Sequence, residues 1–91
     1  MKYVLRDGIQ VDTFSDGEMV IYDQNHEMTH VLNQTAAMAL NAILEKDDGS
    51  AKECFIESVL GFDPNVPVTV LQNDFDNILN DFLKADFVTA R

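Results

Sequence analysis

Two histidines lie four residues apart in the sequence, His26 and His30, with Asp23 and Glu27 close to them. Imidazole is a common zinc ligand, but a structural zinc site normally needs four ordered N or S ligands. A tight turn predicted at residues 24–27 separates the two histidines, so they do not share one helix face. We therefore interpret His26 as a turn residue and His30 as an exposed or partly packed strand residue, and we expect no metal site.

Other side chains with catalytic potential have simpler structural explanations. Cys54 is the only cysteine, which excludes an internal disulfide, and no evident basic neighbour would activate its thiol, so we interpret it as a small buried hydrophobe. Ser50 fits a helix N-cap, with Glu53 three residues later as in a capping box. The glycines are scattered rather than clustered in a phosphate loop, and the acidic segment 73–81 lacks the pattern of a calcium loop. We expect neither an enzyme nor a bound cofactor.

The charge balance limits the partners. The chain has 91 residues, with six Lys and Arg against sixteen Asp and Glu and a formal net charge of −10. Few cations are available to replace the counterions condensed on phosphate, so we expect no binding to nucleic acids, and anionic membranes are disfavoured for the same reason. Neutral or basic peptides and proteins remain possible partners.

The location is predicted from what the sequence lacks. No apolar stretch is long enough to span a bilayer, and the first residues, MKYVLRDG, lack the apolar core of a signal peptide. These two observations favour a cytoplasmic protein.

The secondary structure changes once along the chain. Its first third is rich in β-branched and aromatic residues between turn signals, and the rest has apolar residues at helical spacing. The predicted elements are strands at 3–14, 19–23 and 28–32, and helices at 34–46, 51–60 and 68–85. Residues 1–91 therefore predict a single α+β domain that is winged-helix-like, with a three-stranded antiparallel sheet followed by three helices.

Local signals define several boundaries of these elements. Asp7-Gly8 predicts a bend or bulge within the first strand, and Asn33 is a good N-cap for the first helix. Gly49 is expected to end that helix in a left-handed conformation. After the last helix, Phe87 and Val88 are expected to return to the core.

The third strand is the element of most functional interest. Met28, His30 and Leu32 point to one face of the predicted sheet, whereas Thr29 and Val31 point to the other. A sheet of three strands has at least one open edge unless a cover or a partner occupies it.

Several segments, taken in order, resemble PqqD-like proteins. LNQTAAMAL at 32–40 resembles the Leu-Asn-x-Thr-Ala-Ala motif that begins the first helix of that family. DGEMVIYDQNHEMTHVLN at 16–33 looks like its second and third strands, and EKDDGSAKE at 45–53 looks like its boundary between helices. DNILNDFLKADFV at 76–88 is similar to its final helix. The resemblance covers nearly the whole chain.

This resemblance implies a non-catalytic leader-binding module, a RiPP recognition element. Such modules hold the leader of a ribosomally made precursor peptide and present it to a modifying enzyme, such as a radical SAM enzyme, a cyclase or a leader peptidase. Family members bind the leader as an added strand against the third strand, beside the third helix. Carried onto this chain, the peptide-binding residues would be Glu27, Met28, Thr29, His30, Val31, Leu32, Gln72, Phe75, Asp76, Leu79 and Leu83.

Charge refines this expectation. Asp74, Asp76 and Asp81 lie on the last predicted helix, and only Lys84 offsets them there. If some of these carboxylates lie beside the bound leader, its docking segment should be basic or neutral.

Three other possibilities remain open at this point. The chain could be an adaptor that docks to an enzyme without binding a leader, or two copies could form a homodimer through the open strand edge. A winged-helix nucleic-acid binder has the same architecture, but its recognition helix needs basic or amide side chains, and here that helix is acidic.

Overall fold

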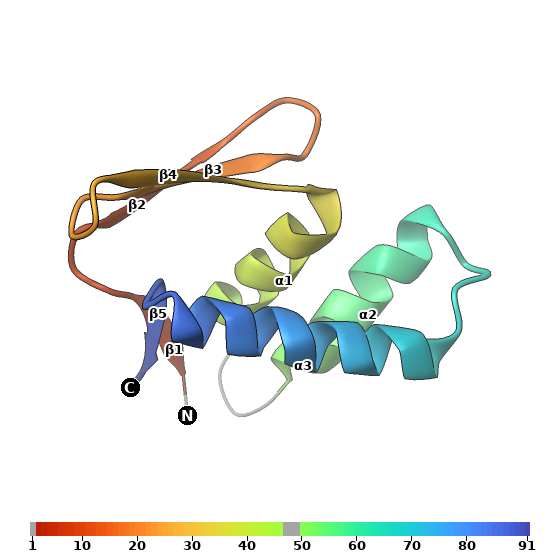
Figure 1. The fold of residues 1–91 in the computed structure, drawn as a ribbon. Helices are drawn as coiled ribbons and strands as arrows, with labels where there is room; N and C mark the ends of the chain where they lie inside the picture. The colour runs from red at the N-terminus through yellow and green to blue at the C-terminus, as the bar shows by residue number, and fades with distance from the viewer. Residues whose placement is uncertain (1, 47–49) are drawn as a thin grey trace.

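The computed structural model describes residues 2–46 and 50–91, and it confirms the α+β architecture. A layer of three helices lies on one side of a three-stranded antiparallel sheet, and a second sheet of two strands lies beside the chain ends (Figure 1). The elements are β1 (Tyr3–Leu5), β2 (Ile9–Thr13), β3 (Met19–Asp23), β4 (Met28–Leu32), α1 (Gln34–Glu45), α2 (Ala51–Phe62), α3 (Val68–Lys84) and β5 (Val88–Ala90).

The three-stranded sheet has the order β2-β3-β4, so β3 is its central strand. Antiparallel registers pair Ile21 of β3 with Val11 of β2 and with His30 of β4. Ile21 is fully buried, because both neighbouring strands flank it and the helices cover its face of the sheet. The central strand therefore fixes the positions of the two outer strands.

The two-stranded sheet was not predicted. The segment at 3–14 does bend at Asp7-Gly8, where Gly8 has φ +88°, but the bend separates two strands that belong to different sheets. β1 pairs with β5 at the other end of the chain, with Tyr3 opposite Ala90. A Cβ atom on Gly8 would lie 2.6 Å from the Asn25 Oδ1 atom, so this position also needs the absence of a side chain.

The helix boundaries agree with the prediction to within two residues. The Asn33 side chain accepts a hydrogen bond of 2.9 Å from the Ala36 N–H, which confirms the predicted N-cap of α1. The capping box predicted at Ser50 is wrong, because Ser50 has a helical backbone (φ −81°, ψ −1°) and its side chain makes no cap bond. The predicted left-handed end at Gly49 lies outside the described residues.

The core lies between the inner face of the sheet and the helices. Leu71, Phe75 and Phe82 of α3 are buried on one face of the helix, and the Phe75 ring lies 5.5 Å from the Phe55 ring on α2. Phe87 and Val88 also return to the core, as predicted. The members of the core cluster are Ile9, Met19, Ile21, Ala37, Ala39, Leu40, Ala42, Ile43, Phe55, Leu71, Phe75, Phe82, Phe87 and Val88.

Cys54 is half-buried and packs against the edge of the core as a free thiol. Among the helices in the described ranges, none is long and apolar enough to cross a bilayer.

The Asn33 cap gives a direct stability test. Replacing Asn33 with Ala removes the acceptor for the Ala36 N–H, so we expect a loss of about 1 kcal/mol in the free energy of unfolding, measured by urea denaturation. Asn41→Ala is the matched control, because Asn41 is exposed in the middle of α1 and alanine favours helix there. Equal losses in both variants would contradict the capping role.

Candidate functional site

β4 is an edge strand, as predicted. Within the described part of the chain it pairs with β3 on one side and with no strand on the other. Its sequence, MTHVL, contains none of the lysines or prolines that commonly protect an exposed edge, and Val31 is 65% exposed. A row of backbone N–H and C=O groups is thus available for another strand.

The two faces of β4 differ as the alternation predicts. His30 and Leu32 are half-buried on the face toward the helices, and Thr29 and Val31 are exposed on the other face. The His30 ring lies 4.9 Å from the Phe87 ring in an edge-on arrangement, which confirms that His30 is partly packed. Met28 shares the inner face and is 53% exposed at the start of the strand.

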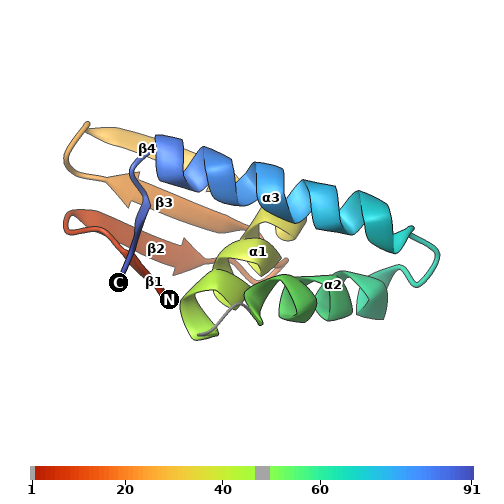
Figure 2. The same cartoon turned by 90° about the horizontal axis from the view of Figure 1, so that it is seen from below.

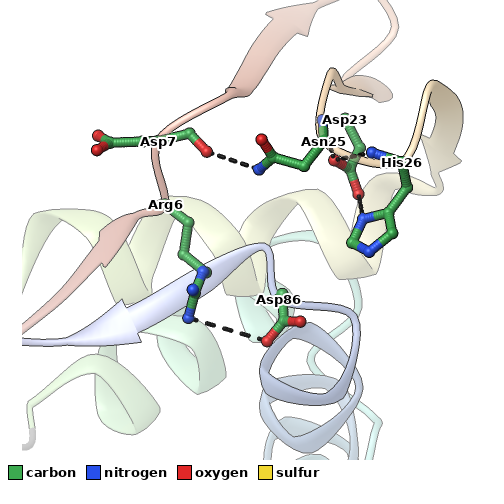
Figure 3. A network of polar contacts seen from close by, with 6 residues as sticks. All are labelled: Arg6, Asp7, Asp23, Asn25, His26 and Asp86. Atoms are coloured by element: carbon green, nitrogen blue, oxygen red, sulfur yellow. Dashed lines mark hydrogen bonds and ion pairs between the residues drawn. The ribbon is translucent and has the colours of Figure 1, made fainter.

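A polar network anchors the turn from which β4 starts (Figure 3). Asp23 is 3% exposed, and its carboxylate accepts hydrogen bonds from the backbone N–H groups of Asn25 and His26 and from the His26 Nδ1 atom at 2.8 Å. The Asn25 side chain donates a 2.8 Å bond to the Asp7 carbonyl, which joins this turn to the β1–β2 connection. Glu27 completes the turn with φ +54°.

Two opposing effects set the pKa of Asp23. Burial raises it, but the hydrogen bonds from His26 and Asn25, with the nearby His26 charge, outweigh burial, so the pKa lies below its ordinary value. The network therefore favours the ionised carboxylate.

The flanks of α3 are identified by one ion pair. Lys52 Nζ on α2 lies 2.8 Å from Asp76 Oδ1, so Asp76 is on the flank of α3 that meets α2. Gln72, Leu79 and Leu83 share this flank, because they are three, four or seven residues away from Asp76.

The structure consequently separates the predicted site residues into groups. Glu27 to Leu32 lie together in β4 and its turn, whereas Phe75 is buried in the core at 4% exposure. The other predicted residues of α3 lie toward α2 rather than beside β4: Gln72, Asp76, Leu79 and Leu83.

The opposite flank of α3 carries Asp74, Ile78 and Asp81. At 3.6 residues per turn these three lie about 140–160° around the helix from Asp76. In Figure 2, which views the molecule from the helix side, α3 lies in front of the β4 side of the sheet and α2 is displaced toward the β2 side. Asp74 and Ile78 are half-buried and Asp81 is exposed. Ile78 also packs against the core cluster, and no sequence signal tells which flank of a helix faces away from its neighbouring helix.

Two cavities lie near β4 and the turn that precedes it. The larger, about 650 Å³, is lined by β1, β5 and the β3–β4 turn, including Arg6, His26 and Asp86. Arg6 and Asp86 pair across it at 3.9 Å. The smaller, about 370 Å³, lies against the start of β4 and is lined in part by Glu27 and Met28.

The described residues contain no group of three or more His, Cys, Asp or Glu side chains placed to hold a metal ion. His26 and His30 lie on different elements, and the Nδ1 atom of His26 is already bonded to Asp23. The chemistry that this region offers is therefore main-chain pairing beside apolar and acidic side chains.

Comparison with known proteins supports the fold. No family model and no curated protein matches the sequence. Two solved structures match over nearly the full chain. One is lasso peptide synthetase B1 complexed with the leader peptide, with a TM-score of 0.78 and 20% identity, covering 99% of this chain and 100% of that one. The other is TbiB1 in complex with the TbiA(β) leader peptide, with a TM-score of 0.76 and 13% identity, covering 100% of this chain and 98% of that one. The chain has the fold of these two B1 proteins.

The Asp23 network predicts an acid-dependent loss of stability. Because the folded state lowers the pKa of Asp23, its stabilising contribution is complete above the ordinary value of 3.8 and is lost as the pH falls through the lower folded value. Asp23→Asn should therefore lower the thermal midpoint at about pH 7 and flatten its decline between about pH 5 and pH 2.

The measurement is thermal unfolding followed by circular dichroism across that pH range. Asp12→Asn, at an exposed position on β2, is the matched control and should keep the wild-type decline. An unchanged acid decline in Asp23→Asn would show that the network does not stabilise the fold.

Proposed function

We propose that this protein is a non-catalytic peptide-binding module that holds the leader of a ribosomal precursor peptide by strand addition to β4. The observation that carries the proposal is the unpaired edge of β4, in a fold shared with two proteins solved with leader peptides bound. In this proposal the module presents the bound peptide to a modifying enzyme or a leader peptidase.

Strand addition explains how such a site can bind without a deep pocket. Pairing with the backbone of an edge strand gives affinity, and side chains at alternate positions of the peptide give selectivity. β4 offers five residues, or about 16 Å of edge. An added strand would place every second side chain on the inner face, beside Met28, His30 and Leu32.

The wall of the proposed site comes from the flank of α3 that faces away from α2. We assign this wall to Asp74, Ile78 and Asp81 because they lie opposite the Lys52–Asp76 ion pair. The residues on the α2 side, and Phe75 in the core, would then support the position of α3 without touching the peptide.

Backbone pairing can be tested with peptides selected from a displayed library of random sequences of about 16 residues, longer than the β4 edge. Each backbone amide of a selected peptide is replaced in turn with its N-methyl form, which cannot donate a hydrogen bond. Binding should weaken at every second position, because only alternate residues of the added strand direct their backbone groups toward β4. Isothermal titration calorimetry measures the affinities.

NMR titration with the same peptide locates the site. We expect the largest amide shifts in residues 27–32 and on α3 around Ile78. Strand addition at β4 would be contradicted if the bound peptide shifts the amide signals of β1 and β5 instead. It would also be contradicted if N-methylation weakens binding without alternating along the peptide.

Met28 tests the contribution of the inner face. Met28→Ala should weaken the selected peptides about fivefold, because burying part of this side chain contributes about 1 kcal/mol. Phe62→Ala is the control, since Phe62 is 71% exposed at the end of α2, away from β4. If both variants bind the peptides with the same affinity as the wild type, Met28 does not contribute to the binding site.

A further inference from the structure

The aspartates of α3 differ in whether they form an ion pair. Asp76 is paired with Lys52 at 2.8 Å on the α2 flank. Among the residues that the structure describes, Asp74 and Asp81 have no ion pair, and Asp74 is nevertheless half-buried. The two unpaired carboxylates lie on the flank that we assign to the peptide site.

Nothing in the described surroundings supplies the missing positive charge. β4 contains no Lys or Arg, and its only titratable side chain, His30, packs against Phe87. Lys84 is the only basic residue of α3, and it forms no ion pair with Asp81. The added strand would therefore lie next to two carboxylates without a counterion from this chain.

We propose that the bound peptide carries Lys or Arg side chains that point toward α3 and pair with Asp74 and Asp81. This inference rests on the proposed function, because it assumes a strand added to β4. It deepens that function by naming the class of peptide, an extended segment with basic residues on one side.

The spacing of the two carboxylates defines the spacing of the cations. Asp74 and Asp81 are seven residues apart on α3, a separation of about 10 Å along the helix axis. In an extended peptide, side chains on the same side recur about every 7 Å, so residues two and four apart span about 7 and 13 Å. Flexible Lys and Arg side chains cover the difference. The basic residues should therefore be two or four positions apart.

The contact between the Phe87 and His30 rings fixes the register of this pairing. It places the end of α3 below the middle of β4. Because α3 and β4 run in opposite directions (Figure 2), Asp81 in the last turn of α3 lies nearer to His30 than Asp74 does. Two residues of an extended strand span only about 7 Å, so Asp74 lies just past Leu32, beside the peptide residues that would extend beyond the strand edge.

The test uses random peptide libraries of about 16 residues, selected separately on the wild type, on the double variant Asp74→Asn/Asp81→Asn and on Asp76→Asn. Wild type and Asp76→Asn should enrich Lys or Arg at pairs of positions two or four apart. The double variant should lose this enrichment. For a peptide selected on the wild type, the double variant should bind about four- to twentyfold more weakly at low salt, and this difference should shrink as salt rises.

Two further variants separate charge from folding. Asp74→Glu/Asp81→Glu keeps both charges and should keep most of the affinity, and Asp81→Asn alone changes an exposed residue that has no bond to lose. The inference is overturned if selected peptides lack paired basic residues, or if Asp76→Asn weakens binding as much as the double variant. Peptides that shift residues 27–32 but lack basic residues would overturn this inference alone, whereas peptides that leave 27–32 unshifted would overturn the proposed function.

Discussion

An antiparallel sheet of three strands has two edge strands. Whether the backbone groups of each edge are paired or unpaired determines whether another strand can bind there. The helices cover one face of the sheet, and the buried central strand β3 holds the outer strands in register. The hydrogen-bonding groups along β4 are then left without a partner in the described chain. Because backbone groups are obligatory hydrogen-bonding groups, this edge is satisfied by water until another strand replaces it.

β4 is held in place by contacts at both of its ends and in its middle. The Asp23 carboxylate orders the turn that precedes the strand, and the Asn33 side chain caps the helix that follows it. Phe87 packs against His30 in the middle of the strand. A strand held in this way loses little freedom when a peptide pairs with it, so most of the ordering cost falls on the peptide.

Local signals in the sequence were sufficient for most elements. Apolar periodicity and turn residues predicted three helices and the strands of the main sheet, and Asn33 caps α1 as predicted. The pairing of β1 with β5 was missed, because three-residue strands at opposite ends of a chain have no periodic pattern to reveal them. Periodicity also predicted α3 itself, but it could not tell which flank of this helix faces α2 and which faces away from it. That distinction depends on a tertiary contact, the ion pair of Asp76 with Lys52.

The missed pairing has a consequence for how the chain can be rearranged. Lys2 and Arg91 exchange backbone hydrogen bonds of 3.3 and 2.7 Å, so the two ends meet at one corner, on the side of α3 away from the sheet (Figure 1). A short linker could join them, and new ends could be opened in the exposed loop between α2 and α3. Such a circular permutant would retain β4 and its turn unchanged, and a fusion partner attached at either original terminus would leave from the same corner.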